Sequence, residues 1–413
     1  MTKQLARQAM LGAFSSAAIV LSGCSAHSSA QAGTAPRPLA QLASPQAASQ
    51  AAAASVALLK TPNGGIQPQA KMDSKGVLHL IYFKGEPGAG DIFYVRSTDG
   101  ASTWSAPLRV NSQPGSAIAM GTIRGAQLAI GRGNSVHVAW NGSGSAEPKG
   151  VDGAPMLYTR LNDAGRAFEP QRSLMTYAGT LDGGGSLAAD LKGDVFVVWH
   201  GSAGAKEDAN RAVYMARSTD NGGSFEREKK ISVQPTGACG CCQLRALVDS
   251  KGALYVFYRA AGQNVNRDST LLVSSDRGST FQSAMLQPWK INACPMSSYA
   301  LFESNGAVRA AWETEEQIYS ASIEPATVKF SAPVAAPAQG DNRKHPTLAV
   351  NAKGEMLLAW TEGTGWNKGG SLAWQIYDAQ GRPTEQKGRA RGVPTWGLLS
   401  AIARPDGGFM LLY

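Results

Sequence analysis

The chain has 413 residues, with 39 Lys and Arg against 30 Asp and Glu, which gives a formal net charge of +9 at pH 7. Helical periodicity is sparse and 47 residues are glycine, so the composition favours one large all-β domain over a helical bundle. The sequence contains no phosphate-binding loop, dinucleotide fingerprint, H-E-x-x-H motif or nucleic-acid-binding motif, which excludes the function classes that depend on them.

Residues 1–23 have the composition of an export signal. Lys3 and Arg7 give a positively charged start, and the mostly apolar stretch 9–21 is too short to span a membrane as a mature helix. Removal of this segment leaves 37 basic and 30 acidic residues, a net charge of +7. A basic surface suits anionic neighbours such as glycans, lipid head groups or acidic proteins, but we expect the charge to be spread diffusely rather than gathered in one binding face.

The segment ends in Leu21-Ser22-Gly23-Cys24, which resembles the lipobox of bacterial lipoproteins. The resemblance implies that Cys24 is lipidated and anchors the exported chain to a membrane, and that Ser25 directs it to the outer membrane of the cell envelope. The alternative is an ordinary secretory signal with an incidental cysteine. Residues 24–54 are rich in Ala, Ser, Gln and Pro and predict a flexible tether ahead of one domain at 55–413.

An eight-residue pattern, S-x-D-x-G-x-T followed by an aromatic residue, recurs along the chain. Near-perfect copies occupy residues 218–225 and 274–281, a looser copy 97–104, and a degraded copy 162–168. In a tight loop the Asp accepts backbone N–H bonds from downstream residues, and the Gly adopts a conformation that other residues resist. Each copy follows a short alternating run, so the pattern predicts repeated β-hairpins.

These octets resemble the Asp box, or BNR repeat, of the sialidase-like β-propellers. The resemblance covers residues 55–413 and implies a propeller fold. It also implies that the box residues are structural and lie away from any active site. The residues concerned are Ser97, Asp99, Trp104, Asp163, Ser218, Asp220, Gly222, Phe225, Ser274, Asp276, Gly278 and Phe281.

A second repeat predicts the number of blades. It consists of a strand, a turn around Gly, and a second strand that usually ends in Trp or Tyr. The seven copies occupy residues 69–82, 127–140, 186–199, 245–258, 299–312, 347–360 and 400–413. A spacing of about 50–60 residues suits a four-stranded blade, so we expect an all-β propeller with seven blades, or alternatively six as in catalytic sialidases. The last copy ends at Tyr413, and residues 54–60 are expected to add a strand to it and close the ring.

The cysteines gather at one mouth of the predicted channel. Cys239, Cys241 and Cys242 precede the first strand of blade four, and Cys294 and Met296 precede that of blade five. Three interpretations stay open. The first is disulfides, which suit an exported protein. The second is a soft-metal site for Cu or Zn, built from thiolates, with His345 as a further candidate ligand and, for Cu, the Met296 thioether. The third is a redox-active or nucleophilic thiol.

The sialidase mechanism, as the family shows it, requires three arginines that clamp the substrate carboxylate, a Tyr nucleophile paired with a Glu, and an Asp acid/base. Where the family has its first arginine, this chain has Ile66-Gln67-Pro68. Where the family has its nucleophile, this chain has Trp396-Gly397-Leu398-Leu399. No catalytic residue is therefore assigned, and the sequence leaves open whether the chain is an enzyme.

The first functional hypothesis is a monomeric binding module of the cell envelope, with a glycan or an envelope protein rather than nucleic acid as partner. We expect the ligand at the channel mouth, near Arg124, Gln243, Arg343, His345 and Trp396. One alternative is an exo-glycosidase that acts on acidic glycans. The other is soft-metal binding at the cysteine cluster.

Overall fold

The computed structural model describes residues 56–413, apart from 122, 205–206, 234, 339 and 341. The signal peptide, the lipidation site Cys24 and the tether at 24–54, all predicted from the sequence, lie outside the described residues. Within the described part, no helix is long and apolar enough to cross a membrane.

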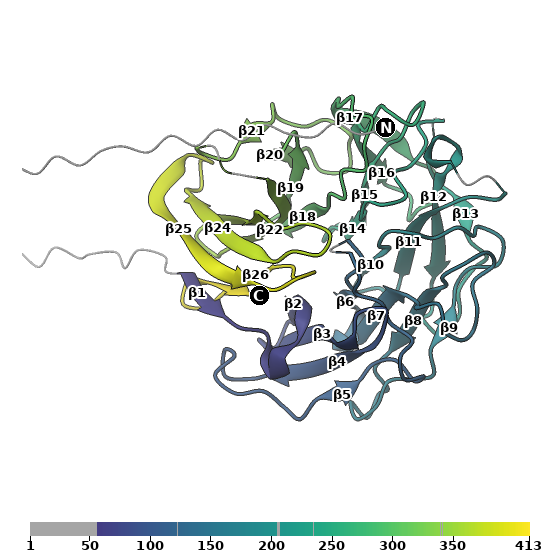
Figure 1. Cartoon of the computed structure of the whole chain (residues 1–413). Coiled ribbons are helices and arrows are strands. Elements are labelled where there is room, and N and C mark those ends of the chain that lie inside the picture. The colour runs from purple at the N-terminus through teal and green to yellow at the C-terminus, as the bar shows by residue number, and fades with distance from the viewer. Residues whose placement is uncertain (1–55, 122, 205–206, 234, 339, 341) are drawn as a thin grey trace, which may run out of the picture. The chain divides into compact units, whose positions relative to one another are not determined.

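Seven β-sheets surround a central axis, and each sheet is one blade (Figure 1). Blade one contains β2 (Ile66–Met72), β3 (Leu78–Glu86), β4 (Ala89–Ser97) and β5 (Leu108–Arg109). Blade two contains β6 (Gln127–Ile130), β7 (Val136–Asn141), β8 (Met156–Arg160) and β9 (Arg172–Ser173). Blade three contains β10 (Ser186–Ala189), β11 (Val195–Gly201), β12 (Ala212–Ser218) and β13 (Lys229–Lys230). Blade four contains β14 (Arg245–Val248), β15 (Leu254–Arg259), β16 (Ser269–Ser274) and β17 (Gln282–Gln287).

The remaining blades follow the same order. Blade five contains β18 (Tyr299–Ser304), β19 (Ala307–Thr314), β20 (Gln317–Ile323) and β21 (Val334–Ala335). Blade six contains β22 (Arg343–Val350), β23 (Met356–Glu362), β24 (Gly370–Tyr377) and β25 (Pro383–Val393). Blade seven contains β26 (Ser400–Ala403), β27 (Phe409–Leu412) and β1 (Val56–Leu59). The described part also has three short 3-10 helices, η1 (Pro62–Gly64), η2 (Arg132–Asn134) and η3 (Asp208–Asn210).

The first strand of each repeat lies innermost. Strands β2, β6, β10, β14, β18, β22 and β26 contact one another in this order, and β26 contacts β2 in turn. The second strands are mostly buried because neighbouring blades cover both faces of each sheet; every residue of β11 and of β15 is buried. The structure therefore confirms the prediction of seven blades, and the alternative of six is wrong.

The two ends of the propeller meet in blade seven. Strand β1 pairs in parallel with β27, with Val56 opposite Phe409 and Leu59 opposite Leu412. The backbone N–H of Tyr413 donates to the Leu59 carbonyl at 3.0 Å, which extends the pairing to the end of the chain. This blade has three strands where the other six have four. The predicted closure of the ring by the terminal strands is confirmed.

The three clear octets form one and the same hydrogen-bonded turn. Ser274 Oγ donates to Asp276 Oδ1 at 2.7 Å and accepts from the Gly278 N–H at 2.8 Å. Asp276 accepts from the backbone N–H and the hydroxyl of Thr280 at 2.9 and 2.6 Å. The same network recurs in residues 97–104 and 218–225. Each turn therefore satisfies its own polar groups, as the sequence pattern predicts.

The degraded octet differs from the sequence assignment. Asn162, and not Asp163, supplies the side-chain acceptor, and its Oδ1 accepts from the Arg166 N–H at 3.1 Å. The aromatic residues of the octets connect blades. Phe225 of blade three contacts Tyr158 of blade two edge to face, with 4.8 Å between the ring centroids.

Candidate functional site

The channel end at which the inner strands begin is filled by packed side chains. Gln243 Nε2 of blade four donates to the Gly125 carbonyl of blade two at 3.5 Å, and a Cβ on Gly125 would lie 3.1 Å from Leu398 of blade seven. These contacts bring blades two, four and seven together at the mouth where the sequence predicts ligand binding. The aligned positions at this end are all buried: Gln67, Gly125, Gly184, Gln243, Ser297, His345 and Leu398.

Arg343 and His345 are buried with this layer, each at 3% exposure. Arg343 Nη1 donates to Gln317 Oε1 at 2.8 Å, and its Nε lies 3.4 Å from Glu362. Arg343 therefore faces the interface between blades five and six, and not the channel. His345 Nδ1 lies 3.2 Å from Ser298 Oγ, and burial lowers the pKa of His345 to about 3, so its ring is neutral at pH 7.

Arg124 and Trp396 come together through Trp366. The Arg124 guanidinium carbon lies 5.7 Å from the centroid of the Trp366 ring, and Trp396 Nε1 donates to the Trp366 carbonyl. Trp366 is 46% exposed. Arg124 is already paired, because its guanidinium donates to the carbonyl of Asp182 at 2.7 Å and to its carboxylate at 2.5 Å. The group offers an aromatic surface to a ligand, with little free charge.

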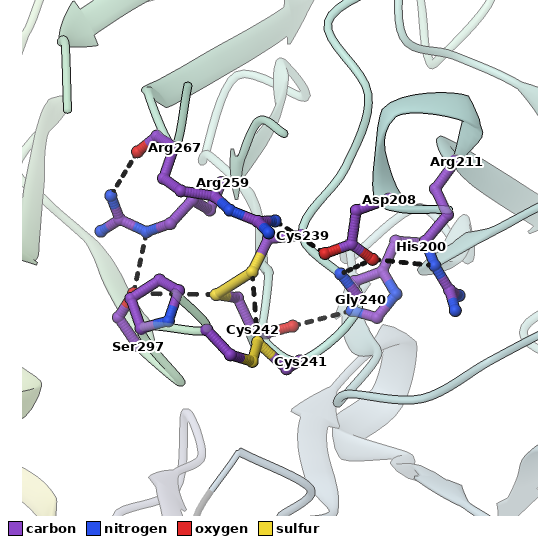
Figure 2. The surroundings of a disulfide bond; sticks show 12 residues. His200, Asp208, Arg211, Cys239, Gly240, Cys241, Cys242, Arg259, Arg267 and Ser297 are labelled. Carbon is purple, nitrogen blue, oxygen red and sulfur yellow. Dashed lines mark hydrogen bonds and ion pairs between the residues drawn. A yellow bond between two sulfur atoms is a disulfide. The ribbon is translucent and has the colours of Figure 1, made fainter. Parts of the chain in front are cut away.

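The cysteine loops of blades four and five meet in two disulfides, Cys239–Cys242 and Cys241–Cys294, with Cα separations of 5.4 and 6.4 Å. Figure 2 shows the surroundings of Cys239, Cys241 and Cys242. Cys239 and Cys242 are each 1% exposed, whereas Cys241 is half-buried and Cys294 is exposed. The Sγ atoms of Cys239, Cys241 and Cys242 all lie within 4.8 Å of one another. The disulfide interpretation is supported, and these three sulfurs are also the set that would ligate a soft metal after reduction.

Asp208 holds the cysteine loop in place (Figure 2). Its carboxylate accepts from the Gly240 backbone N–H at 3.0 Å and from Arg267 Nη1 at 2.7 Å, and it pairs with Arg211 Nε at 3.1 Å. On the other side, His200 Nε2 donates to the Cys242 carbonyl at 2.7 Å. Burial lowers the pKa of His200, so the ring is neutral and acts as a hydrogen-bond donor to the loop.

A buried cation lies beside the Cys242 sulfur. Arg259 is 1% exposed, and its Nε donates to Ser297 Oγ at 2.8 Å. Ser297 Oγ is in turn 3.9 Å from Cys242 Sγ. Glu313, which is fully buried near Arg259, has its pKa raised by burial. The sequence pattern did not predict this polar cluster, because its members come from strands and loops of two blades.

The open space lies within the channel, along the inner strands. A cavity of about 280 Å³ is lined by residues of all seven blades. Its described lining includes no Asp or Glu; the polar side chains are Gln69, Lys71, Arg245, Thr347 and Ser400. Met72, Leu247, Phe302 and Ala403, at the far ends of the inner strands, are all half-buried. These four residues line the end of the cavity next to the turns that follow the inner strands, away from the mouth at which those strands begin.

Two cations face this cavity without a carboxylate partner. Arg245 Nη1 donates to Gln127 Oε1 and its Nε donates to the Tyr299 carbonyl at 3.1 Å, which fixes the guanidinium. Lys71 Nζ has no hydrogen-bond or ion-pair partner among the described residues. Burial and the charge of Arg245 lower the pKa of Lys71 to about 8, and burial lowers that of Arg245 to about 10.

Two hydroxyl groups add donors to the same cavity. Ser400 Oγ accepts from the Ala70 N–H at 3.0 Å, and Thr347 Oγ1 accepts from the Ala401 N–H at 3.2 Å. Within the described part of the chain neither hydroxyl hydrogen has an acceptor. Both hydroxyls are therefore positioned to donate to a ligand in the cavity.

The sequence did contain a signal for these cations. When the seven repeats are aligned on their turn glycines, Lys71 stands where the other copies carry Ala, Leu or Ile. Arg245 stands where the other copies carry only uncharged residues. A charge that occurs at an inner-strand position in one repeat alone indicates a residue that lines the channel. Alignment of the repeats does not show that the two charges share a cavity.

No family model matches this sequence, and no curated protein matches it. Among solved structures, an α-L-arabinanase from Penicillium chrysogenum aligns with a TM-score of 0.51 and 14% identity, over 79% of this chain and 98% of that chain. The Hadza microbial sialidase Hz136 aligns with a TM-score of 0.48 and 14% identity, over 76% of this chain and 70% of that one.

A sialidase from Trypanosoma rangeli aligns with a TM-score of 0.47 and 13% identity, over 76% of this chain and 56% of that one. Sialidases and related propeller glycosidases are thus among the structural neighbours of this chain. At these identities the likeness shows the fold alone, since a fold of this kind hosts many chemistries.

Proposed function

We propose that the propeller is a ligand-binding module of the cell envelope and that its channel receives an anionic group of the ligand. The observation that carries the proposal is the pairing of Lys71 and Arg245 in one cavity whose described lining has no carboxylate. Two like charges close together in a partly buried site repel each other and are poorly solvated. An anion between them relieves both costs.

The donors around the cavity suit a carboxylate. Lys71 Nζ supplies a mobile point charge, and Arg245 is held rigidly by Gln127 and Tyr299. The hydroxyls of Thr347 and Ser400 complete a set of donors with no competing acid in the described lining. A volume of about 280 Å³ accommodates one sugar-sized unit, so the proposed ligand is the terminal acidic unit of a glycan.

The proposal includes a location at the cell envelope, which is inferred from the sequence alone. The motif ending in Cys24 supports export and lipid anchoring, and residues 24–54 supply the tether. An anchored propeller at the cell envelope would meet acidic glycans. The net positive charge of the mature chain favours their approach.

The test is a calorimetric titration of the full chain carrying Cys24→Ser with galacturonate, N-acetylneuraminate and neutral galactose. We expect the acids to bind at least about tenfold more tightly than galactose, since a partly buried charge pair contributes more than 1 kcal/mol. Lys71→Met should abolish this preference. The control Lys75→Met removes an exposed lysine of the following turn and should leave it intact. Equal affinity for galactose and galacturonate contradicts the proposal.

A second candidate is sugar binding at the surface formed by Trp366 and Trp396, which is favoured by the exposure of Trp366. In that case galactose and galacturonate bind alike, and Trp366→Ala weakens both while Lys71→Met weakens neither. Turnover of acidic glycosides, measured on the same samples, tests the exo-glycosidase alternative. Hydrolysis lost in Lys71→Met would make the channel an active site.

A further inference from the structure

We propose that the four cysteines form a two-disulfide relay, in which the exposed Cys241–Cys294 bond accepts electrons from an external dithiol and passes them to the buried Cys239–Cys242 bond. Figure 2 shows the sulfurs of Cys239, Cys241 and Cys242 side by side in the loop that precedes β14. The relay is an activity separate from ligand binding in the channel, and neither proposal depends on the other.

The first step depends on the unequal exposure of the two bonds. Cys294 is exposed and Cys241 is half-buried, whereas Cys239 and Cys242 are each 1% exposed. Disulfide reduction requires direct attack of a thiolate on a sulfur atom, so accessibility decides which bond reacts. An external dithiol therefore reaches the Cys241–Cys294 bond, through the sulfur of Cys294, and does not reach the buried bond.

The exchange with the dithiol takes two thiolate attacks. One thiolate of the dithiol bonds to Cys294 Sγ, the Cys241–Cys294 bond breaks, and Cys241 leaves as a thiolate. The second thiolate of the dithiol then attacks its partner sulfur in the mixed disulfide, which releases Cys294 as a thiolate and the dithiol as a cyclic or linked disulfide. Two electrons pass to the protein, and the two dithiol protons go to solvent or to the new cysteine thiols.

The second step is internal. Cys241 Sγ lies 3.5 Å from Cys239 Sγ, within contact distance of the buried bond. The Cys241 thiolate bonds to Cys239, the Cys239–Cys242 bond breaks, and Cys242 becomes the thiolate. One disulfide and one thiolate are present before and after this step, so it needs no oxidant, reductant or proton.

The Cys242 sulfur, which leaves as a thiolate, lies near a hydroxyl group that stabilises its negative charge. Ser297 Oγ is 3.9 Å from Cys242 Sγ and accepts a hydrogen bond from Arg259 Nε at 2.8 Å. The Ser297 hydroxyl also hydrogen-bonds the Glu313 carboxyl group, so its hydrogen must turn from Glu313 to the Cys242 thiolate when that sulfur leaves. The charge of the buried Arg259 acts through the same contact and favours a thiolate over a thiol.

Two variants of the full chain form a matched test, both with Cys24→Ser so that no fifth thiol takes part. Cys294→Ser and Cys241→Ser each remove the same disulfide and therefore lose the same cross-link. Only Cys294→Ser leaves a free thiol next to the buried bond. The variants are purified without reductant, exposed to iodoacetamide for increasing times, acidified, and mapped by mass spectrometry.

The relay predicts that alkylated Cys242 accumulates in Cys294→Ser, together with a Cys239–Cys241 linkage. In Cys241→Ser it predicts alkylation at Cys294 alone, with Cys239–Cys242 intact. The proposal is overturned if Cys294→Ser is alkylated only at Cys241. It is overturned equally if alkylated Cys242 appears at the same rate in both variants, because exchange would then not require Cys241.

Wild-type protein gives a second measurement that does not depend on the folding of either variant. During reduction by dithiothreitol, thiols at Cys294 should appear first and the Cys239–Cys241 linkage next. Ser297→Ala should slow the appearance of the Cys242 thiol about threefold to tenfold, and Ser298→Ala should not. Simultaneous reduction of both disulfides without the Cys239–Cys241 intermediate overturns the relay.

Discussion

Arg277 of blade four donates two hydrogen bonds, at 2.5 and 2.6 Å, to the carboxylate of Asp194 in blade three. Asp194 is fully buried, while Arg277 is half-exposed and belongs to the octet turn of its blade. The only other cation on this carboxylate in the described structure is Arg217, at 3.3 Å. The octet therefore has a role beyond its own turn, since it neutralises a charge of the neighbouring blade.

Replacing Arg277 by Met should lower the free energy of unfolding by about 2 kcal/mol, because it removes the two shorter hydrogen bonds of a buried carboxylate and leaves only the one from Arg217 at 3.3 Å. Chemical denaturation monitored by tryptophan fluorescence measures the change. Lys329→Met is the control, since Lys329 and Glu324 form an exposed pair at 3.8 Å that should contribute at most about 0.5 kcal/mol. Equal effects of the two substitutions would show that Asp194 does not depend on Arg277.

The octet turns themselves predict a pH-dependent stability. Hydrogen bonds from the Thr280 hydroxyl and backbone and from Ser274 hold the pKa of Asp276 well below its ordinary value. A depressed carboxyl pKa stabilises the fold above the unfolded value of about 4, and this stabilisation is lost as pH falls through the folded pKa. Asp276→Asn should therefore cost about 1 kcal/mol at pH 7, allowing for solvent screening, and progressively less below pH 4.

Asp163 offers the matched control for Asp276. It belongs to the degraded octet, in which Asn162 and not Asp163 accepts the turn hydrogen bond. Asp163→Asn should leave the unfolding transition unchanged at both pH 7 and pH 3. A loss of stability as large as that of Asp276→Asn would mean that Asp163 does accept stabilising hydrogen bonds in the turn of the degraded octet.

The third prediction concerns β1, the strand that closes the ring. Leu58 of β1 packs against the core between blades six and seven and pairs with Leu411 of β27. Leu58→Asp places a charge against this apolar surface and should cost about 2 kcal/mol or more, with earlier unfolding in a thermal scan. Leu191→Asp makes the same change at a residue that is 75% exposed and should shift the transition little. Comparable losses would argue against closure by β1.

The number and order of the blades could be predicted because the repeat pattern of each blade is local in the sequence. Each inner pair of strands is one continuous segment with a glycine at its turn, as in Gly252 (φ 93°) and Gly306 (φ 76°), and only its own residues are needed to recognise it. The closure by residues 56–59 followed from an incomplete last blade, which required a strand from elsewhere in the chain.

The packing at the mouth and the cavity within the channel could not be predicted in the same way. Gln243 reaches Gly125 across 118 positions of sequence, and Lys71 meets the charge of Arg245 from the far side of the ring. Such contacts depend on the diameter of the channel and on the direction of each side chain, which a repeat pattern does not specify. Arg343 likewise lies at an inner-strand start but turns towards Gln317 between blades.

The cysteine cluster predicts metal binding that depends on its redox state. The oxidised chain should bind neither Zn(II) nor Cu(I), since its four sulfurs at this site are paired. After reduction, the sulfurs of Cys239, Cys241 and Cys242 should bind one equivalent, because thiolates select these ions. Competition with a chromophoric chelator measures the affinity under anaerobic conditions.

Met296 distinguishes the two ions in this experiment. Met296→Leu should weaken Cu(I) and leave Zn(II) unaffected if the thioether is a ligand, since a thioether suits the softer ion. Cys242→Ser should weaken both. Binding of either metal at unchanged strength in Cys242→Ser would place the metal elsewhere in the chain.

Lys71 makes ligand binding in the channel pH-dependent. Its pKa is lowered to about 8 by burial and by Arg245, so it is charged at pH 7 and largely neutral at pH 9.5. Affinity for galacturonate should therefore be constant between pH 6 and 7 and fall as pH rises through about 8. Near pH 8 binding should also take up a proton, because the bound anion raises the pKa of Lys71. Calorimetry in buffers of different ionisation enthalpy measures this uptake.

The lowered pKa of Lys71 has the opposite effect on the stability of the unliganded protein, which should increase as pH rises. Between about pH 8 and 10.5 the unfolded chain binds more protons at Lys71 than the folded one, so this group makes unfolding less favourable as pH rises. Lys71→Met should remove both trends, the loss of affinity and the gain in stability, whereas Lys75→Met should keep both. An affinity for galacturonate that is unchanged from pH 7 to pH 9.5 would exclude Lys71 from the binding site.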